Sequence, residues 1–74
     1  MERLTLSERE ILGLNIAYYR KAKKMSQMQF ANYINLSRTH LAAIESGSKD
    51  PSLALLYRIA EALEVPVSRL FEQR

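Results

Sequence analysis

Side chains that donate hydrogen bonds cluster at the start of the segment INLSRTHLAAIESG, residues 34–47. Arg38, Thr39 and His40 follow one another there, and such donors bind the acceptor atoms of bases and phosphates. An acid, Glu45, stands near the end of the segment, where an apolar stripe is expected. The chain has no cysteine, and no serine–acid pairing surrounds His40, so the groups of a nucleophilic catalyst are missing. The chemistry that the segment favours is binding, and the chain is not predicted to be an enzyme.

A short helix is the element that positions these side chains. Ser37 precedes them, and serine is a favoured residue at the start of a helix. Leu41 and Ile44 lie three positions apart, so both point to one side of the helix, which we expect to be the core side. Arg38 and His40 then flank an outward face of small or polar residues, namely Thr39, Ala42, Ala43 and Ser46.

Positive charge is concentrated around this helix, within a formal net charge of +3 for the whole chain. Residues 20–51 contain six Lys or Arg and two acids, a balance of +4. Residues 1–19 contain two Arg and three Glu, a balance of −1, and residues 52–74 contain three of each, a balance of zero. Such clustering suits a polyanionic partner, although a solvated basic face fits the charge count equally well.

The rest of the chain predicts an all-α domain of five helices. Apolar residues recur every three or four positions, strand-like alternation is absent, and only two Gly and two Pro interrupt the pattern. The first helix begins near Ser7, with Glu10 completing a capping box, or at Thr5 with Glu8 in that role. We expect the later helices to begin at four places, near Ser26, Ser37, Ser52 and Val67.

Length and composition exclude other classes of protein. At 74 residues the chain is predicted to form one domain, residues 1–74, with a core of modest size. Without cysteine it has no disulfide or thiolate metal site, and its single histidine rules out a two-histidine metal pair. No apolar run approaches the roughly 18 residues of a membrane span, and no signal peptide is evident. We therefore expect a cytoplasmic protein without membrane association, metal, cofactor or small-molecule ligand.

Two of the expected helices form a helix-turn-helix pattern. About three residues join the helix that begins at Ser26 to the helix that begins at Ser37. Small Ala31 at the crossing lets the two helices approach closely, and Asn35 readily takes the left-handed conformation that ends the first of them. In a helix-turn-helix, the second helix enters the major groove of DNA. The polar side chains beginning at Arg38 would then face base edges.

The segment MSQMQFANYINLSRTHLAAIESGSKDPSLALLYRIAEALEVPVSRLF resembles the lambda-repressor-like, or XRE/Cro, family of DNA-binding domains. The similarity covers about residues 12–71. It includes the Ser-Gln that starts the second helix, the Leu-Ser before the third, the Ile-Glu-x-Gly that ends the third, the Pro-Ser before the fourth and the closing Val-Pro-x-x-x-Leu-Phe. The resemblance implies a compact five-helix DNA-binding domain with its helix-turn-helix at helices 2 and 3.

The resemblance also implies a role for each matching residue. Arg38 and Thr39 would read bases, Arg38 with two hydrogen bonds to a guanine. His40 is left open between base contact, phosphate contact and plain exposure. Ala42 and Ala43 would touch a thymine methyl group or let the helix lie deep in the groove. Four residues would hold backbone phosphates, namely Gln27, Ser46, Ser48 and Lys49.

Glu45 acquires a structural role from the same resemblance. In the family an acid at this position pairs with an arginine near the end of the first helix, and Arg20 occupies that position. We therefore expect a largely buried bridge between Arg20 and Glu45. Two positions depart from the family pattern, because Lys24 and Asn35 stand where glycine is usual. Asn35 is expected to tolerate the left-handed backbone well, whereas Lys24 either adopts it at a cost of about 1 kcal/mol or the first helix ends differently.

The predicted function is that of a sequence-specific double-stranded DNA-binding transcriptional regulator. One module of this size buries too little surface for tight binding, so a homodimer on an operator with two half-sites is expected. Apolar residues of the C-terminal part are the expected dimer surface, namely Leu55, Val67, Leu70 and Phe71.

Several alternatives remain open within and beside this prediction. A restriction–modification controller protein, a phage Cro-like repressor and an antitoxin all fit the resemblance. A protein–protein interaction module, an antitoxin or adaptor whose helix-turn-helix fold does not read DNA, is the alternative from another class. Positive or polar groups at Gln27, Arg38 and Lys49 argue against that alternative, because a protein that does not bind DNA has no need of them at all three positions.

Overall fold

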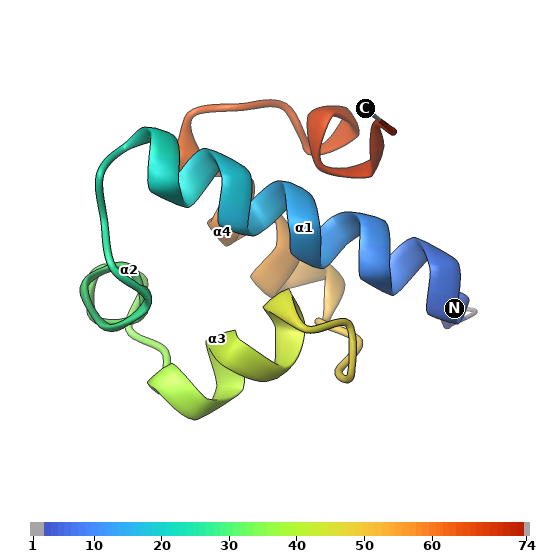
Figure 1. Cartoon of the computed structure of the whole chain (residues 1–74), viewed down its shortest axis with the longest axis horizontal. Helices are drawn as coiled ribbons and strands as arrows, with labels where there is room; N and C mark the ends of the chain where they lie inside the picture. The colour runs from blue at the N-terminus through green and yellow to red at the C-terminus, as the bar shows by residue number, and fades with distance from the viewer. Residues whose placement is uncertain (1–2, 74) are drawn as a thin grey trace.

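The computed structural model describes residues 3–73 and shows an all-helical protein (Figure 1), with no strand in this part of the chain. The ends of the predicted domain, residues 1–2 and 74, lie outside the described residues. None of the helices within residues 3–73 is long and apolar enough to cross a membrane. Four α-helices are followed by a 3₁₀ helix, so the last expected helix has the tighter geometry: α1 (Leu6–Ala22), α2 (Gln27–Tyr33), α3 (Arg38–Glu45), α4 (Leu53–Leu63) and η1 (Val67–Phe71).

The start of α1 decides between the two capping boxes that the sequence allowed. Thr5 Oγ1 accepts a hydrogen bond from the Glu8 backbone N–H at 3.1 Å, and Glu8 Oε1 accepts one from the Thr5 N–H at 2.8 Å. Ser7 therefore lies inside the first turn rather than at the cap. A capping box satisfies two backbone donors that a helix start otherwise leaves without partners.

The other α-helices begin at the serines that the sequence predicted. Ser26 forms a reciprocal capping box with Gln29, with hydrogen bonds of 2.8 and 3.0 Å. Ser37 Oγ accepts from the His40 N–H, and Ser52 Oγ accepts from the Leu55 N–H. Serine side chains thus fix the starts of α2, α3 and α4.

Left-handed backbone ends or separates the helices. Lys24 and Asn35 both have φ of 60°, so Lys24 adopts the left-handed backbone, one of the two outcomes that its sequence position allowed, and Gly47 has φ of 82° after the end of α3. Glu64 also has a positive φ, of 61°, and ends α4 just before Val65 and Pro66. The short connections between helices depend on these reversals of the backbone.

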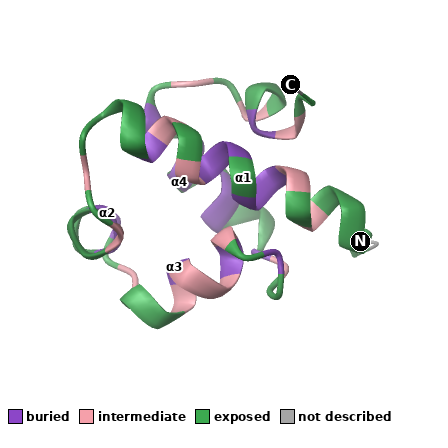
Figure 2. Cartoon of the chain, viewed as in Figure 1, coloured by how far each residue is buried: buried purple, intermediate pink, exposed green. Residues whose placement is uncertain are grey.

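The core lies where α1, α2, α3, α4 and η1 converge, as the buried segments in Figure 2 show. Its fully buried large side chains are Phe30, Leu12, Ile16, Leu41, Ile44, Ile59 and Leu70. Leu55 and Leu70, expected on a dimer surface, are 7% and 0% exposed and belong to this core. Val67 and Phe71 are half-buried and pack against it. Two of the four residues expected at the dimer surface are therefore unavailable to a partner, because they complete the core of their own protomer.

The first helix is the central element, with η1 on one side of it and α3 on the other (Figure 1). Gly13 allows α3 to come close, because a Cβ at this position would stand 2.2 Å from the backbone oxygen of Glu45. On the other side, Asn15 Nδ2 donates to the carbonyl oxygens of Leu70 and Glu72 at 2.9 and 2.8 Å. These two residues of α1 place α3 and η1, and neither was singled out from the sequence.

Candidate nucleic-acid interface

The third helix presents its first turn to solvent. Arg38 and Thr39 are exposed, whereas Leu41 is fully buried in the core. Ala42 and Ala43 are partly buried and add no long side chain to the outward face. The structure thus places Arg38 and Thr39, the two strongest candidates for base contact, at the exposed N-terminal end of α3. The small side chains of Ala42 and Ala43 follow them along the helix.

His40 is only partly exposed, and its ring is turned toward the protein. Its Nε2 is buried and has no hydrogen-bond partner among the described residues. The backbone N–H of His40 is used by the Ser37 cap at 3.1 Å. Of the three possibilities that the sequence left open for this residue, plain exposure does not describe it.

A buried ion pair holds α3 against α1. Arg20 Nε and Nη2 donate to the two carboxylate oxygens of Glu45 at 2.8 and 3.0 Å, and the two side chains are only 9% and 6% exposed. Arg20 Nη1 also donates to the backbone oxygen of Met25, at 2.9 Å. Both charges are therefore paired and hydrogen-bonded, as buried charges must be. Through Arg20, the end of α3 and the turn before α2 are both attached to α1.

The side chain of Gln27 belongs to this cluster. Its Nε2 donates to Glu45 Oε1 at 3.0 Å, and the residue is only partly exposed. A glutamine amide has two N–H donors, so one remains for another acceptor. Glu45 thereby joins α1, α2 and α3, whereas the sequence predicted Arg20 as its single partner.

The hydroxyl groups of Ser46 and Ser48 are occupied within the protein. Both Oγ atoms donate a hydrogen bond to the backbone oxygen of Ala43, at 3.0 and 3.1 Å, and they are 3.1 Å from each other. They satisfy a carbonyl group at the C-terminal end of α3. A phosphate oxygen accepts hydrogen bonds, so binding it requires these hydroxyl groups to rotate away from Ala43.

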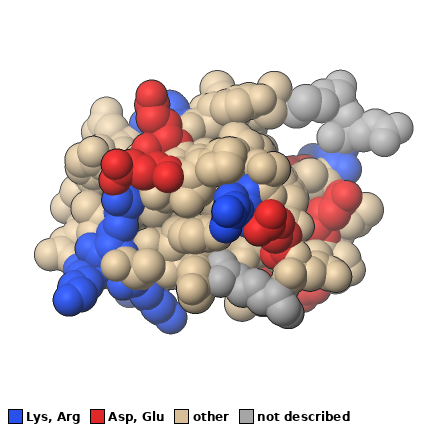
Figure 3. All heavy atoms as spheres, turned by 90° about the horizontal axis from the view of Figure 1, so that it is seen from above, with Lys and Arg blue, Asp and Glu red and all other residues tan. Residues whose placement is uncertain are grey.

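The positive charge of residues 20–51 is not confined to the surroundings of α3. Lys21, Lys23 and Lys24 are exposed at the end of α1, and Figure 3 shows blue side chains gathered there, with acidic ones beside them. Lys23 forms an ion pair with Glu64. The basic groups near α3 are therefore fewer than the segment count suggests, with Arg38 at its start and Lys49 after its end, both exposed.

Arg9 is a third residue that the sequence did not bring forward. Its Nε donates to the Gly47 oxygen at 3.0 Å and its Nη1 to the Leu4 oxygen at 3.1 Å. The Leu4 N–H in turn donates to Asp50 Oδ2 at 3.0 Å. These contacts tie the residues before α1 to the loop after α3. No sequence pattern marks them, because both acceptors of Arg9 are backbone carbonyl groups.

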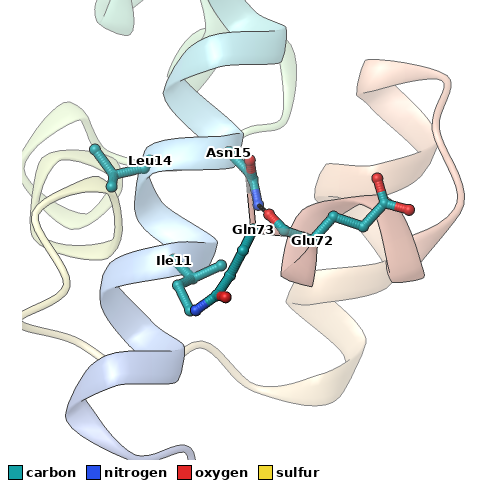
Figure 4. A pocket seen from close by; sticks show the side chains of 5 residues that line it. All are labelled: Ile11, Leu14, Asn15, Glu72 and Gln73. Carbon is teal, nitrogen blue, oxygen red and sulfur yellow. Dashed lines mark hydrogen bonds between the residues drawn. The ribbon is translucent and has the colours of Figure 1, made fainter.

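A hollow lies away from α3. It has a volume of about 300 Å³ and is lined by residues of α1 and of the chain after η1 (Figure 4), namely Ile11, Leu14, Asn15, Glu72 and Gln73. The chain after η1 contributes part of its lining, and η1 lies on the side of α1 opposite to α3 (Figure 1). The described residues hold no group of three His, Cys, Asp or Glu suited to a metal ion.

Comparison with known proteins identifies the family to which this chain belongs. Residues 16–70 match a family model described as helix-turn-helix. The immunity repressor of Bacillus phage phi105 is 42% identical over 59 residues, which are 80% of this chain and 41% of the repressor. This chain thus spans about two fifths of that relative's length.

Two solved structures of restriction–modification controller proteins share the fold. The crystal structure of C.AhdI from Aeromonas hydrophila has a TM-score of 0.81 at 28% identity, and the match covers 88% of this chain and 98% of that one. The C.Esp1396I tetramer in complex with its natural 35 base-pair operator has a TM-score of 0.74 at 30% identity, covering 85% of this chain and 83% of that one. A controller bound to DNA therefore has the same helical arrangement.

Proposed function

The chain belongs to the helix-turn-helix family, and from this premise we infer that it is a sequence-specific DNA-binding transcription regulator. The observation that carries the inference is the exposed first turn of α3, with Arg38 and Thr39 outward, on a helix fixed to α1 by a buried ion pair. A rigid helix with outward donors meets the need of direct base readout, because base edges must be met at fixed positions. The C.Esp1396I complex with its operator supports DNA as the partner.

We propose that α2 and α3 are the helix-turn-helix, with α3 in the major groove. Arg38 then donates two hydrogen bonds to a guanine, and Thr39 contacts the neighbouring base. Ala42 and Ala43 leave room for α3 to lie deep or contact a thymine methyl group. His40 is the weakest of the predicted base-reading residues, because its Nε2 faces the protein.

Phosphate contacts would surround this reading helix. The second amide N–H of Gln27 is available beside its bond to Glu45, and Lys49 is exposed after the end of α3. Ser46 and Ser48 contribute only after leaving Ala43, so we assign them a smaller share. Such contacts fix the register of the protein on the duplex without reading its sequence.

The regulator is proposed to act as a homodimer. A groove of about 500 Å³ lies between the residues before α1, the start of α4 and η1, and its apolar lining includes Leu53, Val67 and Phe71. Leu53 is 48% exposed, a large share for an apolar side chain. We place the dimer contact at this groove, with Leu53 in place of the buried Leu55 and Leu70. A restriction–modification controller, a phage repressor and an antitoxin are all consistent with such a dimer.

Selection of bound sites from a random duplex library tests this function. The expected result is a two-fold symmetric motif with half-sites about one helical turn apart. A motif without symmetry would contradict the dimer and leave sequence reading intact. Weak, strongly salt-dependent binding without any enriched motif would overturn the function, because it would show phosphate attraction alone.

A further inference from the structure

A basic hollow lies where the residues before α1 meet the loop after α3. It has a volume of about 300 Å³ and is lined by Arg3, Arg9, Ser48, Lys49 and Asp50. Three cations and one acid give this lining a formal charge of +2. Within residues 3–73, no acid forms an ion pair with any of the three cations. As far as residues 3–73 are concerned, the positive charge of the hollow is thus left available to an anion from outside.

Hydrogen bonds give the hollow a fixed shape. Arg9 donates from two nitrogens to two carbonyl oxygens, those of Gly47 and Leu4, and thereby joins the loop to the chain before α1. The Leu4 N–H donates a hydrogen bond to Asp50 Oδ2, so one carboxylate oxygen of this acid already has a partner within the protein. Leu4 is anchored in addition by its packing against the core. Arg3 and Lys49 are consequently held on neighbouring, tethered pieces of backbone.

The position of the hollow relative to α3 identifies the anion. The loop that contains Lys49 continues directly from the C-terminal end of α3 and turns toward the N-terminal end of α1 (Figure 1). When the first turn of α3 reaches base edges, the backbone that borders the groove runs past both ends of that helix. A phosphate of that backbone is the anion that comes within reach.

We propose that this hollow binds a phosphate of the DNA backbone, with Arg3 and Lys49 in contact with it and Arg9 as a positioning residue. The proposal rests on the proposed function and extends it to the chain before α1, for which no contact with DNA was expected. Arginine and lysine suit the site, because both donate charge-assisted hydrogen bonds to phosphate oxygens.

The salt dependence of binding to a selected duplex measures the contact. The slope of log K against log salt concentration changes by about 0.9 for each phosphate contact. Arg3→Gln should reduce the slope by about one such contact per protomer, and so by about two contacts for the dimer, and it should weaken binding to all sequences alike. Arg3→Lys keeps the charge and should restore most of the slope. Arg69→Gln is the matched control, because Arg69 is an exposed arginine of η1, on the side of α1 away from α3.

Arg9→Lys tests the positioning role separately. Lysine keeps the charge but cannot span two carbonyl oxygens as a planar guanidinium does. A reduced slope at unchanged base preference would support positioning, and a slope equal to the wild type would make Arg9 a purely structural residue. An unchanged slope in Arg3→Gln, while the wild type binds its motif, would overturn the phosphate site alone. Failure of the wild type to select any motif would overturn the proposed function and this site with it.

Discussion

Arg20 and Glu45 form a doubly hydrogen-bonded ion pair inside the protein, with N–O distances of 2.8 and 3.0 Å. The pair connects the end of α1 to the end of α3, and Gln27 of α2 joins it through the same carboxylate. The outward turn of α3 is therefore held by a polar cluster as well as by the apolar contacts of Leu41 and Ile44. Breaking the cluster should loosen the reading helix as well as the fold.

Glu45→Gln should destabilise the protein markedly. The substitution leaves the Arg20 charge buried without its counter-ion, and removing one partner of a buried pair costs about 3–5 kcal/mol. Chemical denaturation measures the change in the free energy of unfolding. Glu61→Gln removes an acid from an exposed position of α4 and serves as the control. Equal stability of Glu45→Gln and the wild type would show that the pair contributes nothing to the fold.

Gly13→Ala should also destabilise the protein, although alanine is the better helix former. The new Cβ would stand 2.2 Å from the Glu45 oxygen, so α3 must shift away from α1. Overpacking of this kind costs about 1–3 kcal/mol. Thermal unfolding of the variant, beside Lys21→Ala at an exposed position of the same helix, gives the comparison. A more stable Gly13→Ala protein would mean that α1 and α3 are not in close contact.

Glu64 should titrate below its ordinary pKa of 4.5, because Lys23 donates a hydrogen bond to its carboxylate and attracts its charge. Since the pKa is lowered in the folded protein, the stabilisation from this pair is present above the unfolded pKa. It is lost as the pH falls through the folded value. An NMR titration of the Glu64 carboxyl carbon measures the shift. Lys23→Gln should return the pKa toward 4.5, and the same low pKa in both proteins would rule out Lys23 as the cause.

Leu53→Glu should weaken the dimer and leave the protomer folded. Leu53 lines the groove beside Val67 and Phe71 and is half exposed, so a charge there is solvated in the monomer and buried in the dimer. Sedimentation at micromolar concentration should show a dimeric wild type and a monomeric variant. Leu14→Glu, at a 71% exposed site away from this groove, should remain dimeric. A wild type that sediments as a monomer would remove the groove as a dimer contact.

Local signals explain why much of the fold was predictable from the sequence. Ser26, Ser37 and Ser52 act on backbone groups within one turn, so their caps depend little on the rest of the chain. The left-handed turns at Lys24 and Asn35 are equally local. The pairing of Arg20 with Glu45 came from the family resemblance, which carries tertiary information that spacing alone does not.

Tertiary contacts explain what the sequence did not reveal. Leu55 and Leu70 look like any other apolar residue near the C-terminus, and only the packing of α4 and η1 decides that both are buried. The hydroxyl groups of Ser46 and Ser48 bond to the backbone carbonyl group of Ala43, because it lies within reach at the end of α3. Arg9 was missed for a related reason, since its partners are carbonyl groups about 40 residues apart in the chain.

We propose above all that α3 reads DNA sequence through its first turn. The most direct test is selection from a random duplex library with the wild type and with Arg38→Ala in parallel. Both proteins should select one symmetric motif, with the variant losing its preference at one base pair of each half-site, a loss of about 1–3 kcal/mol of discrimination. An unchanged preference at every position in Arg38→Ala would contradict this proposal.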